Sequence, residues 1–449
     1  MKKNSLLKAI LVTFFIYVLA SWFINGGIFY QGSYYKADSS IVLGIGDIFS
    51  LPYQAFYLFA EYGVIFLIIG GFYGVLNQTG VLHKIVLKIA SILKNKTFAL
   101  IFISFLIMSF ESIIGSSLLT FTLIPFFALI LNEFGFKKHD IMFATVGSLL
   151  LGTFASTLGF NEFLNYLAEI SKKSLLSVRL ILFLVTFIIL VVTLILKTKK
   201  NKEDEKLEFD YVEGTKKGIL LFIILTFTLL IAIIGFYNFN DFLNVKVFNN
   251  FYTKTLAEIK FFNGMSPLGS WTTKDLAGLL LIISLIVSIC YRIRPKELVS
   301  SFISGAKTML KASILATLTG IIFMSYYNSQ TGYNLIDTIV NFIYSSSSNY
   351  LSLKTALATP IYMILFNNPL FLASNMVPII GNLTSNKEMI TSSLLSLQMM
   401  NGITLLIIPT SYILIAGLAY FDISYGKWLK YIWKLILILL LITGIIVLM

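Results

Sequence analysis

The chain has 449 residues, of which 57% are hydrophobic and 12% are charged, and its formal net charge is +13 at pH 7. A soluble globular chain is about 25% charged, so this composition excludes a soluble enzyme or binding module and indicates a polytopic membrane protein. The positive charge does not indicate nucleic-acid binding, because lysines gather at the ends of membrane spans in any case.

Few residues are of the types that hold a metal or carry out covalent chemistry. The chain has two histidines, His83 and His139, and one cysteine, Cys290. The sequence contains no H-E-x-x-H motif, paired-cysteine metal site, G-x-G-x-x-G motif or P-loop. We therefore predict no cofactor other than a coupling ion, no disulfide within the chain, and a buried inert thiol at Cys290.

The first apolar run, 6–24, follows the basic start MKKNSLLK. No small-residue cleavage site follows it, so a retained span with a cytoplasmic N-terminus is predicted. A second span at 56–76 leads back to the lysine-rich segment 79–96. The apolar stretch 97–131 is too long for one span and has basic residues at both ends. A hairpin that enters and leaves from the cytoplasm is therefore predicted there.

Two spans, 141–166 and 180–196, complete the first half of the chain. The charged run at 197–217 then predicts a solvated cytoplasmic linker. The second half opens with spans at 218–236 and 275–291, and the second of these ends at three basic residues that indicate the cytoplasmic side.

The next span, 307–326, leads to segment 332–350, which contains no lysine or arginine and is placed outside the membrane. The long apolar stretch 351–384 is then a hairpin that enters from the outer side. A broken helix at 388–420 and a last span at 431–449 follow, which places the C-terminus outside the cell.

The two halves align on each other at a nearly constant offset. Three pairs of landmarks keep one register: Gly80 and Gly332 (332 − 80 = 252), Pro125 and Pro378 (378 − 125 = 253), and Thr157 and Thr410 (410 − 157 = 253). The arm after the first landmark is basic and the arm after the second is not, which predicts repeats of opposite orientation, as in secondary transporters. The alternative is that Gly, Pro and Thr interrupt membrane helices in general.

The predicted fold is an all-α polytopic membrane protein with two inverted repeats. Each repeat has a re-entrant helical hairpin and a broken transmembrane helix, and the chain has about nine spans plus the two hairpins. The predicted units are an N-terminal span with its outer loop, the first repeat, the linker, the scaffold spans and the second repeat: 1–55, 56–196, 197–217, 218–300 and 301–449.

Candidate binding residues lie at the four interruptions, FESIIGSSLLT and LFNNPLF in the hairpins and GTFASTLGFN and IIPTSY in the broken helices. Helix ends freed at membrane depth expose backbone groups that favour an anion or Na⁺. The predicted substrate- and ion-binding residues are Glu111, Gly115, Ser116, Ser117, Thr153, Ser156, Thr157, Asn161, Asn367, Asn368, Asn401, Pro409, Thr410 and Ser411. The alternative is that these groups satisfy their own kinked backbone or help helices to pack.

Glu111 is the one acid deep in an apolar stretch. A carboxylate there is costly unless it is paired, protonated or bound to a cation. It is predicted to carry a coupling proton or to meet the amino group of a substrate, and the alternative is an interfacial carboxylate in a shallower hairpin. H⁺ and Na⁺ are the candidate coupling ions.

Three stretches are distinctive: LIIGGFYGVLNQTGVL, PFFALILNEFGF followed by GTFASTLG, and IIPTSYILIAGLAYFDISYGKWLKYIW. They resemble the YfcC family, relatives of the DcuC-type anaerobic C4-dicarboxylate carriers within the ion transporter superfamily, over roughly 56–160 and 300–440. The resemblance implies an elevator-type carrier, in which hairpins and broken helices move substrate against a scaffold that usually dimerises. It also implies carboxylate or amino-acid substrates, moved by exchange or with a cation.

The chain departs from the family at the hairpin tips, which in the family are richer in glycine and serine, with acidic residues in the first. This chain has NNPLF in the second tip and a lone Glu111 in the first. The identity of the substrate is therefore not carried over from the resemblance.

We predict a multi-pass cell-membrane protein that acts as an exchanger or cation-coupled symporter of small carboxylates or amino acids and forms a homodimer. Its predicted partners are the substrate and membrane lipid, with no nucleic acid. A membrane-embedded transferase and a channel are the alternatives. The transferase is disfavoured because carboxylate, histidine and metal-binding groups do not converge in the sequence, and a channel would show no saturation.

Overall fold

The computed structural model describes most of the chain as helices. The described residues are 5–24, 26–30, 33–36, 42–159, 175–200, 205–214, 216, 218–239, 259–260, 263–327, 335–345, 350–365 and 368–448. Their helical content confirms the predicted all-α membrane class. One small antiparallel hairpin, β1 (Gly27–Tyr30) with β2 (Ser33–Lys36), lies in the stretch predicted to be an outer loop.

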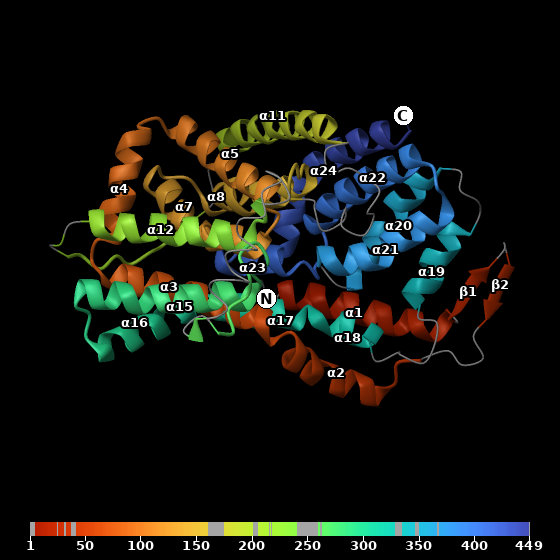
Figure 1. The fold of residues 1–449 in the computed structure, drawn as a ribbon, viewed down its shortest axis with the longest axis horizontal. Helices are drawn as coiled ribbons and strands as arrows, with labels where there is room; N and C mark the ends of the chain where they lie inside the picture. Colours follow the sequence, from red (N-terminus) through yellow and green to blue (C-terminus); the bar gives the residue numbers. More distant parts are fainter. Residues whose placement is uncertain are drawn as a thin grey trace.

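The first half contains the helices that precede the charged linker (Figure 1). They are α1 (Ser5–Phe23), α2 (Ile45–Leu58), α3 (Ala60–Gln78), α4 (Leu82–Leu93), α5 (Lys96–Ile114), α6 (Ser117–Thr122), α7 (Ile124–Glu133), α8 (Lys138–Met142), the π-helical turn η1 (Phe143–Gly147), α9 (Ser148–Phe154) and α11 (Leu176–Lys200).

The second half follows the linker. Its described helices are α12 (Ile219–Phe236), α15 (Thr273–Tyr291), α16 (Pro295–Thr308), α17 (Leu310–Leu318), α18 (Gly320–Tyr327), α19 (Leu335–Tyr344), α20 (Leu351–Leu365), α21 (Pro369–Leu383), α22 (Lys387–Leu405), α23 (Tyr412–Tyr420) and α24 (Tyr425–Leu448).

Local chemistry sets several helix ends. The side chain of Asn95 accepts two backbone N–H groups at the start of α5, and Asn386 caps α22 in the same way. At the other end of α5, Gly115 has a left-handed φ of 71° that stops the helix. A helix therefore ends at the glycine of FESIIGSS, where the turn of the first hairpin was predicted.

Within the described residues, seven helices are long and apolar enough to cross a membrane, or eight if the bent pair Pro295–Thr308 and Leu310–Tyr326 is one span. The sequence predicted about nine spans. The described part of the first predicted broken helix, 141–159, and the second, 388–420, do not qualify as spans, because each is divided into shorter or less apolar helices; residues 160–166 lie outside the described residues. The α5 arm of the predicted first hairpin qualifies instead.

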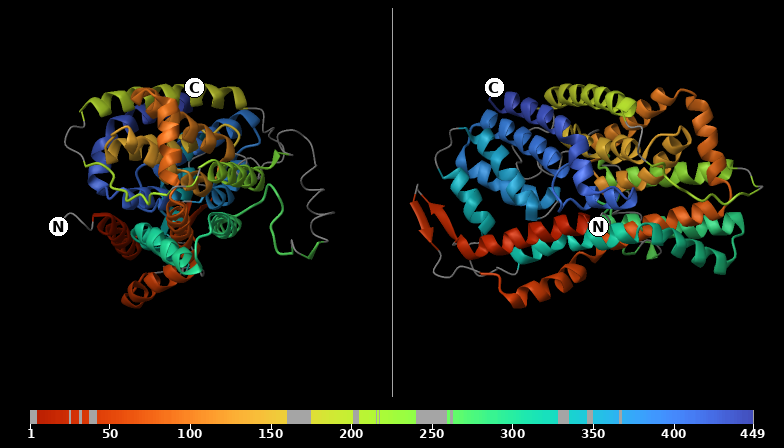
Figure 2. Two further views of the ribbon diagram at one scale, coloured as in Figure 1. Left: turned by 90° about the vertical axis from the view of Figure 1, so that its left-hand side faces the viewer. Right: turned by 180° about the vertical axis from the view of Figure 1, so that it is seen from behind.

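The long helices run along the molecule. Helices α3, α15 and α16 lie side by side toward one end, α1, α17 and α18 continue this layer toward the other end, and the hairpin and broken-helix elements pack above it (Figures 1 and 2). Helices α3 and α16 of this layer are in backbone contact, since a Cβ at Gly70 would lie 2.6 Å from the carbonyl oxygen of Gly305. Small residues let two membrane helices approach to backbone contact in this way.

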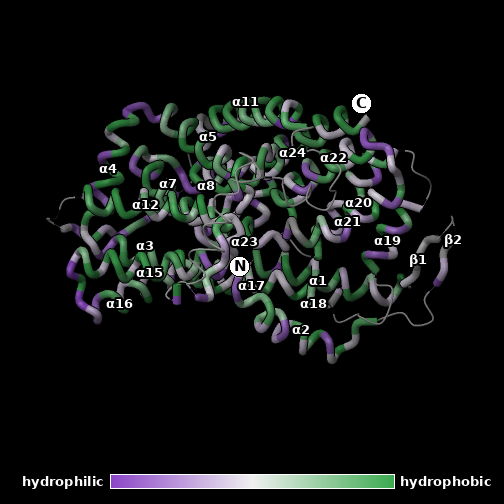
Figure 3. The backbone as a smooth tube through the Cα atoms, in the orientation of Figure 1, coloured by the Kyte–Doolittle hydropathy of each residue, from purple (hydrophilic) through white to green (hydrophobic). Residues whose placement is uncertain are grey.

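The two short helices α4 and α19 stand across the long ones at opposite ends of the molecule (Figure 1). The basic segments meet at the α4 end, where the backbone N–H of Lys138 donates to the carbonyl of Glu205 in the linker at 3.1 Å. At the other end the β hairpin packs on α19, and Thr338 Oγ1 donates to Gly27 O at 3.0 Å. Hydrophilic residues are prominent on α4, α16 and the neighbouring loops, whereas the long helices are mostly hydrophobic (Figure 3).

The prediction of a buried thiol at Cys290 is wrong, because this residue is exposed on α15. The buried face of α15 carries residues such as Leu280, Ile283 and Val287, and Cys290 lies on the opposite side. In a membrane protein an apolar position need not be covered by protein, since lipid solvates it equally well.

Candidate functional site

Glu111 is the centre of a hydrogen-bonded cluster where α5, α6 and α9 meet, and it is 1% exposed. Ser117 Oγ and Thr153 Oγ1 donate to its Oε1 at 2.6 and 3.1 Å. Thr120 Oγ1 donates to Oε2 at 2.6 Å. In the part of the chain that the structure describes, no basic side chain forms a salt bridge with Glu111. A buried carboxylate held only by hydroxyls is a place where a proton or a small cation binds favourably.

The turn of the first hairpin touches the end of the first broken helix. A Cβ on Gly115 would overlap the carbonyl oxygen of Gly159, so only glycine fits there. Ser112, one turn earlier on α5, extends the contact, because its carbonyl accepts the N–H groups of Thr157 at 2.9 Å and Gly159 at 3.0 Å. The hairpin turn and the first break therefore form one structural unit.

The first break exposes a run of four carbonyls, from residue 154 to residue 157, and side chains from three other helices satisfy them. Ser112 Oγ on α5 donates to Ala155 O at 2.9 Å. Arg179 Nη1 on α11 donates to Thr157 O at 3.2 Å, and Arg179 is 1% exposed. A guanidinium buried at this depth marks a functional site or its support.

The other two carbonyls are bonded from the second half of the chain. Gln398 Nε2 on α22 donates to Phe154 O at 3.2 Å and to Ser156 O at 2.8 Å. One turn later, a Cβ on Gly402 would overlap the backbone of Phe154, so α22 and α9 are in backbone contact. Asn401, between them, is 2% exposed, and its Oδ1 has no hydrogen-bond partner among the described residues.

The second break is satisfied by a different helix. Pro409 has no N–H to donate, and the carbonyls of Leu406 and Ile407 have left the helical pattern. Trp428 Nε1 on α24 donates to Leu406 O at 2.9 Å, and the hydroxyl of Tyr425, also on α24, donates to Ile407 O. Side chains from other helices thus bond carbonyls at both breaks, but the helices that supply them differ.

The hydroxyl groups beside the second break bond to backbone. Thr410 Oγ1 donates to Met363 O on α20 at 3.3 Å. Ser411 Oγ accepts the N–H of Leu414 at 3.4 Å and caps α23. For these two residues the structure shows the backbone-satisfying role that was the alternative to ligand binding.

The second hairpin tip lies beside α3. Asn368 Nδ2 donates to the hydroxyl of Tyr62 at 3.4 Å, and Asn368 Oδ1 accepts the N–H of Phe371 at the start of α21. The ring of Tyr62 in turn lies 4.8 Å from that of Tyr412, the first residue of α23. An aromatic pair therefore connects the second tip with the second break.

The predicted binding residues from the first half of the chain lie in one cluster, and those from the second half lie in another. The first cluster contains Glu111, Gly115, Ser117, Thr153, Ser156 and Thr157, with Ser116 half-buried beside it at the start of α6. The second contains Asn368, Pro409, Thr410 and Ser411, with Asn401 on the helix between the two clusters. The predicted residues Asn161 and Asn367 lie outside the described residues.

Four residues of the first cluster are absent from the predicted set: Ser112, Thr120, Arg179 and Gln398. Arg179 carried a usable signal, since a basic residue directly before the apolar run 180–196 is either a span end or a buried charge. No sequence signal pointed to Thr120 or Gln398, because hydroxyl and amide side chains are common on membrane helices. Only the folded chain brings Thr120 to Glu111 and Gln398 to the first break.

No metal centre accompanies this cluster in the described part of the chain. None of its groups of histidine, cysteine, aspartate and glutamate side chains has the three members needed to hold a metal ion. The chemistry of the cluster is that of one carboxylate, one guanidinium, hydroxyls and backbone carbonyls, which bind ions and small polar molecules.

Comparison with family models matches residues 33–449 to the DcuC family, described as C4-dicarboxylate anaerobic carriers. The chain belongs to the DcuC carrier family. This confirms the relationship that the three sequence stretches predicted, and it makes this DcuC-family carrier a multi-pass membrane transporter rather than an enzyme. No curated protein matches the carrier in sequence.

Among solved structures, this DcuC-family carrier is similar to the YdaH transporter of Alcanivorax borkumensis, which is described as having an unusual topology. The similarity covers 98% of this chain and 97% of the YdaH chain, with 14% sequence identity and a TM-score of 0.42.

Proposed function

We propose that this carrier is a secondary active transporter that moves small carboxylates across the cytoplasmic membrane, by exchange or together with H⁺ or Na⁺. The observation that carries the proposal is the buried Glu111 cluster at the junction of a hairpin turn and a broken helix. A carboxylate at membrane depth without a cationic partner has a clear use in a carrier, because a bound cation can neutralise it during each cycle.

The substrate is proposed to be a C4-dicarboxylate or an amino acid with a free carboxylate. Arg179 approaches the same break as Glu111, through Thr157 O. Arginine is well suited to a carboxylate, because its planar guanidinium can bond both oxygens. The description of the family supports a dicarboxylate, and an amino acid would add an ammonium group that the Glu111 carboxylate attracts.

The architecture is proposed to be a pair of inverted repeats that work as an elevator. Helices α4 and α19 begin 253 residues apart (335 − 82), and α6 and α21 begin 252 apart (369 − 117). These spacings agree with the offset between the sequence landmarks, and α4 and α19 lie at opposite ends of the molecule (Figure 1). Repeats of opposite orientation place a site near the bilayer midplane and let one part move against the other.

The basic end of the molecule is proposed to be cytoplasmic, because lysine and arginine concentrate there. An N-terminus inside the cell and a C-terminus outside are proposed from the distribution of charge along the sequence. A homodimer is proposed from the resemblance to carriers whose scaffold dimerises, and mass photometry of the detergent-solubilised protein measures it.

Transport by purified protein in proteoliposomes tests the proposal. Vesicles loaded with succinate, aspartate or buffer are given labelled succinate or aspartate outside, with no gradient, with an imposed pH gradient, or with an imposed Na⁺ gradient. Saturable uptake that depends on internal substrate identifies an exchanger, and accumulation driven by one gradient identifies the coupling ion. Uptake of neither compound in any arm would contradict the proposed substrate class.

Variants of Arg179 test the proposed contact with the substrate carboxylate. Loss of one charge-assisted interaction of about 1.5–3 kcal/mol predicts that Arg179→Leu raises the KM for succinate at least about tenfold. Arg179→Lys keeps the charge and is expected to restore part of the affinity. Equal KM values for the parent protein and Arg179→Leu would show that Arg179 does not bind the substrate, and the proposed fold would be unaffected by that result.

A further inference from the structure

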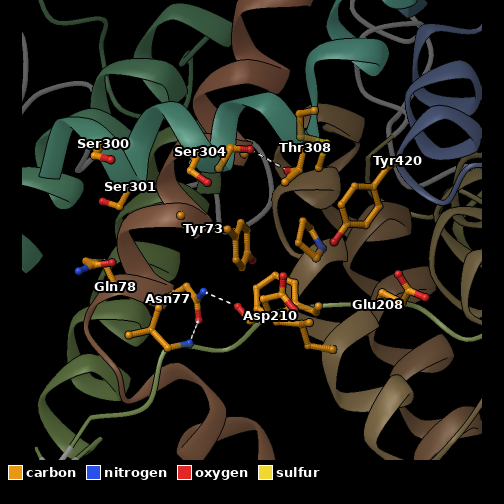
Figure 4. A pocket seen from close by; sticks show the side chains of 18 of the residues that line it. Tyr73, Asn77, Gln78, Glu208, Asp210, Ser300, Ser301, Ser304, Thr308 and Tyr420 are labelled. Carbon is orange, nitrogen blue, oxygen red and sulfur yellow. Dashed lines mark hydrogen bonds between the residues drawn. The ribbon is translucent and has the colours of Figure 1, made fainter. Parts of the chain in front are cut away.

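A cavity of about 850 Å³ lies at the basic end of the molecule, between α3, α7, α16 and the linker segment 205–214, which we call the strap. The helices contribute hydroxyl and amide side chains to its wall, among them Asn77, Gln78, Ser300, Ser304 and Thr308. The strap contributes Glu208 and Asp210 from the facing side (Figure 4). A cavity of this size, with apolar walls and several hydroxyl, amide and carboxylate groups, is of the kind that admits small molecules.

One end of the strap is clamped to α3 by a single side chain. Asn77 Nδ2 donates to Asp210 O at 2.9 Å, and the N–H of Val212 donates to Asn77 Oδ1 at 3.2 Å (Figure 4). The amide of Asn77 thus donates one hydrogen bond to the strap backbone and accepts one from it, as the backbone of a neighbouring β-strand would. Just beyond, Gly80 and Gly214 are in backbone contact, since a Cβ on Gly80 would lie 2.6 Å from the Cα of Gly214.

The strap is also bonded to α7, on the other side of the cavity. Tyr211 OH donates to Glu133 Oε1 at 3.3 Å, and its ring stacks on His83 with the centroids 3.8 Å apart. Burial and the charge of Glu133 raise the pKa of Tyr211 above its ordinary value, so this phenol keeps the proton that it donates.

At its beginning the strap meets α8. Lys138 forms a salt bridge to Glu205 with Nζ 3.3 Å from Oε2, in addition to the backbone bond between the same residues. Lys84 Nζ on α4 donates to Gly214 O at the far end of the strap. The strap is therefore held by α3 and α4 at that end and by α7 and α8 along the rest of its length.

The inner wall of the cavity leads toward the Glu111 cluster. Tyr73 lines the cavity, and its hydroxyl donates to Thr122 O on α6 at 2.8 Å. Thr120, two residues earlier on α6, bonds directly to Glu111. Less than one turn of helix thus separates the cavity wall from the cluster.

We infer that this cavity is the cytoplasmic vestibule through which the carrier exchanges substrate, and that the strap is its lid. The inference rests on the proposed function. Because α7 and α8 belong to the hairpin and broken-helix elements and α3 does not, a movement between them stretches the strap and releases one of its supports. The clamp at Asn77 is the support that faces the cavity, and it consists of two exposed hydrogen bonds on one side chain.

Cysteine accessibility tests the lid. In a Cys290→Ser background, Ser304→Cys reports on the vestibule, and Lys94→Cys, which is exposed beyond α4, reports on the same end of the molecule outside it. Inside-out vesicles are treated with a membrane-impermeant maleimide. Loss of the two Asn77 bonds predicts that Asn77→Ala speeds labelling of Ser304→Cys about fivefold or more and leaves Lys94→Cys unchanged.

Gln78→Ala is the matched control, because Gln78 is the next residue, lines the same cavity and makes no bond to the strap among the described residues. The same labelling rate in Asn77→Ala and Gln78→Ala would overturn the lid. If Asn77→Ala is not monodisperse, Asn77→Asp is used instead, which keeps the acceptor for Val212 and removes the donor to Asp210.

Blocking the vestibule tests the route. Coupling a bulky maleimide to Ser304→Cys is expected to lower substrate uptake at least about tenfold, whereas the same label on Lys94→Cys leaves it unchanged. Full uptake by labelled Ser304→Cys would overturn the vestibule. Because the labelling rates do not depend on transport, the lid can be confirmed or rejected even if none of the tested substrates is carried.

Discussion

At the scale of single residues, the carrier buries a carboxylate and a guanidinium near the same helix break. Glu111 has three hydroxyl donors from two helices, and Arg179 reaches the same break from a third. The hydroxyl donors satisfy the carboxylate, but they supply no compensating charge. A site arranged in this way responds to the arrival and departure of a cation, which is what a coupled transporter requires.

Replacing Glu111 by glutamine tests this role. Glutamine keeps the shape of the side chain but removes the negative charge, so no cation needs to bind. We expect Glu111→Gln to reduce gradient-driven accumulation at least about tenfold, the equivalent of one charge-assisted hydrogen bond, while exchange of internal for external substrate continues. Accumulation and exchange are both measured in the same proteoliposomes.

Glu61→Gln is the control, because Glu61 is also on a spanning helix but is exposed. It is expected to behave as the parent protein. If Glu111→Gln still accumulated substrate in response to the same gradient, the coupling role of Glu111 would be excluded.

At the scale of elements, each interruption of a helix is held by side chains from other helices. The first break takes its partners from α5, α11 and α22, and the second takes them from α24. Exposed carbonyls at membrane depth cost free energy unless they are bonded, so the breaks exist only because these neighbours are in place. The turn at Gly115 adds a steric condition, since nothing larger than glycine fits against Gly159.

Gly115→Ala is expected to damage the carrier more than an ordinary glycine substitution. A left-handed φ costs about 1–2 kcal/mol for a residue with a Cβ, and here the Cβ also overlaps backbone. Gly135→Ala is the matched control, because Gly135 has a similar φ of 72° and open space around it. We expect a distinctly lower Tm and lower uptake for Gly115→Ala than for Gly135→Ala, measured by thermal unfolding and transport. Equal Tm values would show that the turn has room to relax.

At the scale of the whole molecule, the two halves are joined through α9 and α22. Gln398 bonds two carbonyls of the first break, and Gly402 lets the two helices meet at backbone distance. The first break therefore depends on a helix from the second half, about 240 residues away in sequence (398 − 156 = 242). Neither half of the chain contains everything that its own site requires.

Gln398→Leu is expected to lower the stability of the whole carrier. It leaves two buried carbonyls without donors, at about 1–3 kcal/mol each. Thr443→Val is the control, because Thr443 is also buried but bonds only within its own helix. Thermal unfolding of the two purified variants should give a clearly lower Tm for Gln398→Leu. A Tm equal to that of Thr443→Val would mean that water replaces the lost donor.

The sequence by itself determined the membrane class, the positions of most of the long spans, with α5 as an exception, and the helix ends at Gly115 and Pro409. Span positions follow from apolar length, and interruptions follow from Gly, Pro and polar residues, and both are local properties. The DcuC relationship was also present in local motifs, and the family match confirms it. Glu111 was recognisable because a charge within an apolar run is rare wherever the chain goes.

Only the tertiary structure decided what the interruptions contact. Ser112, Thr120 and Gln398 are ordinary polar residues of membrane helices, and their importance arises from helices that are distant in sequence meeting at one point. The same holds for Thr410 and Ser411, which bond to backbone rather than standing free. Hydrophobic patterns specify where a helix lies but not which neighbour its polar groups face, because that depends on packing across the whole chain.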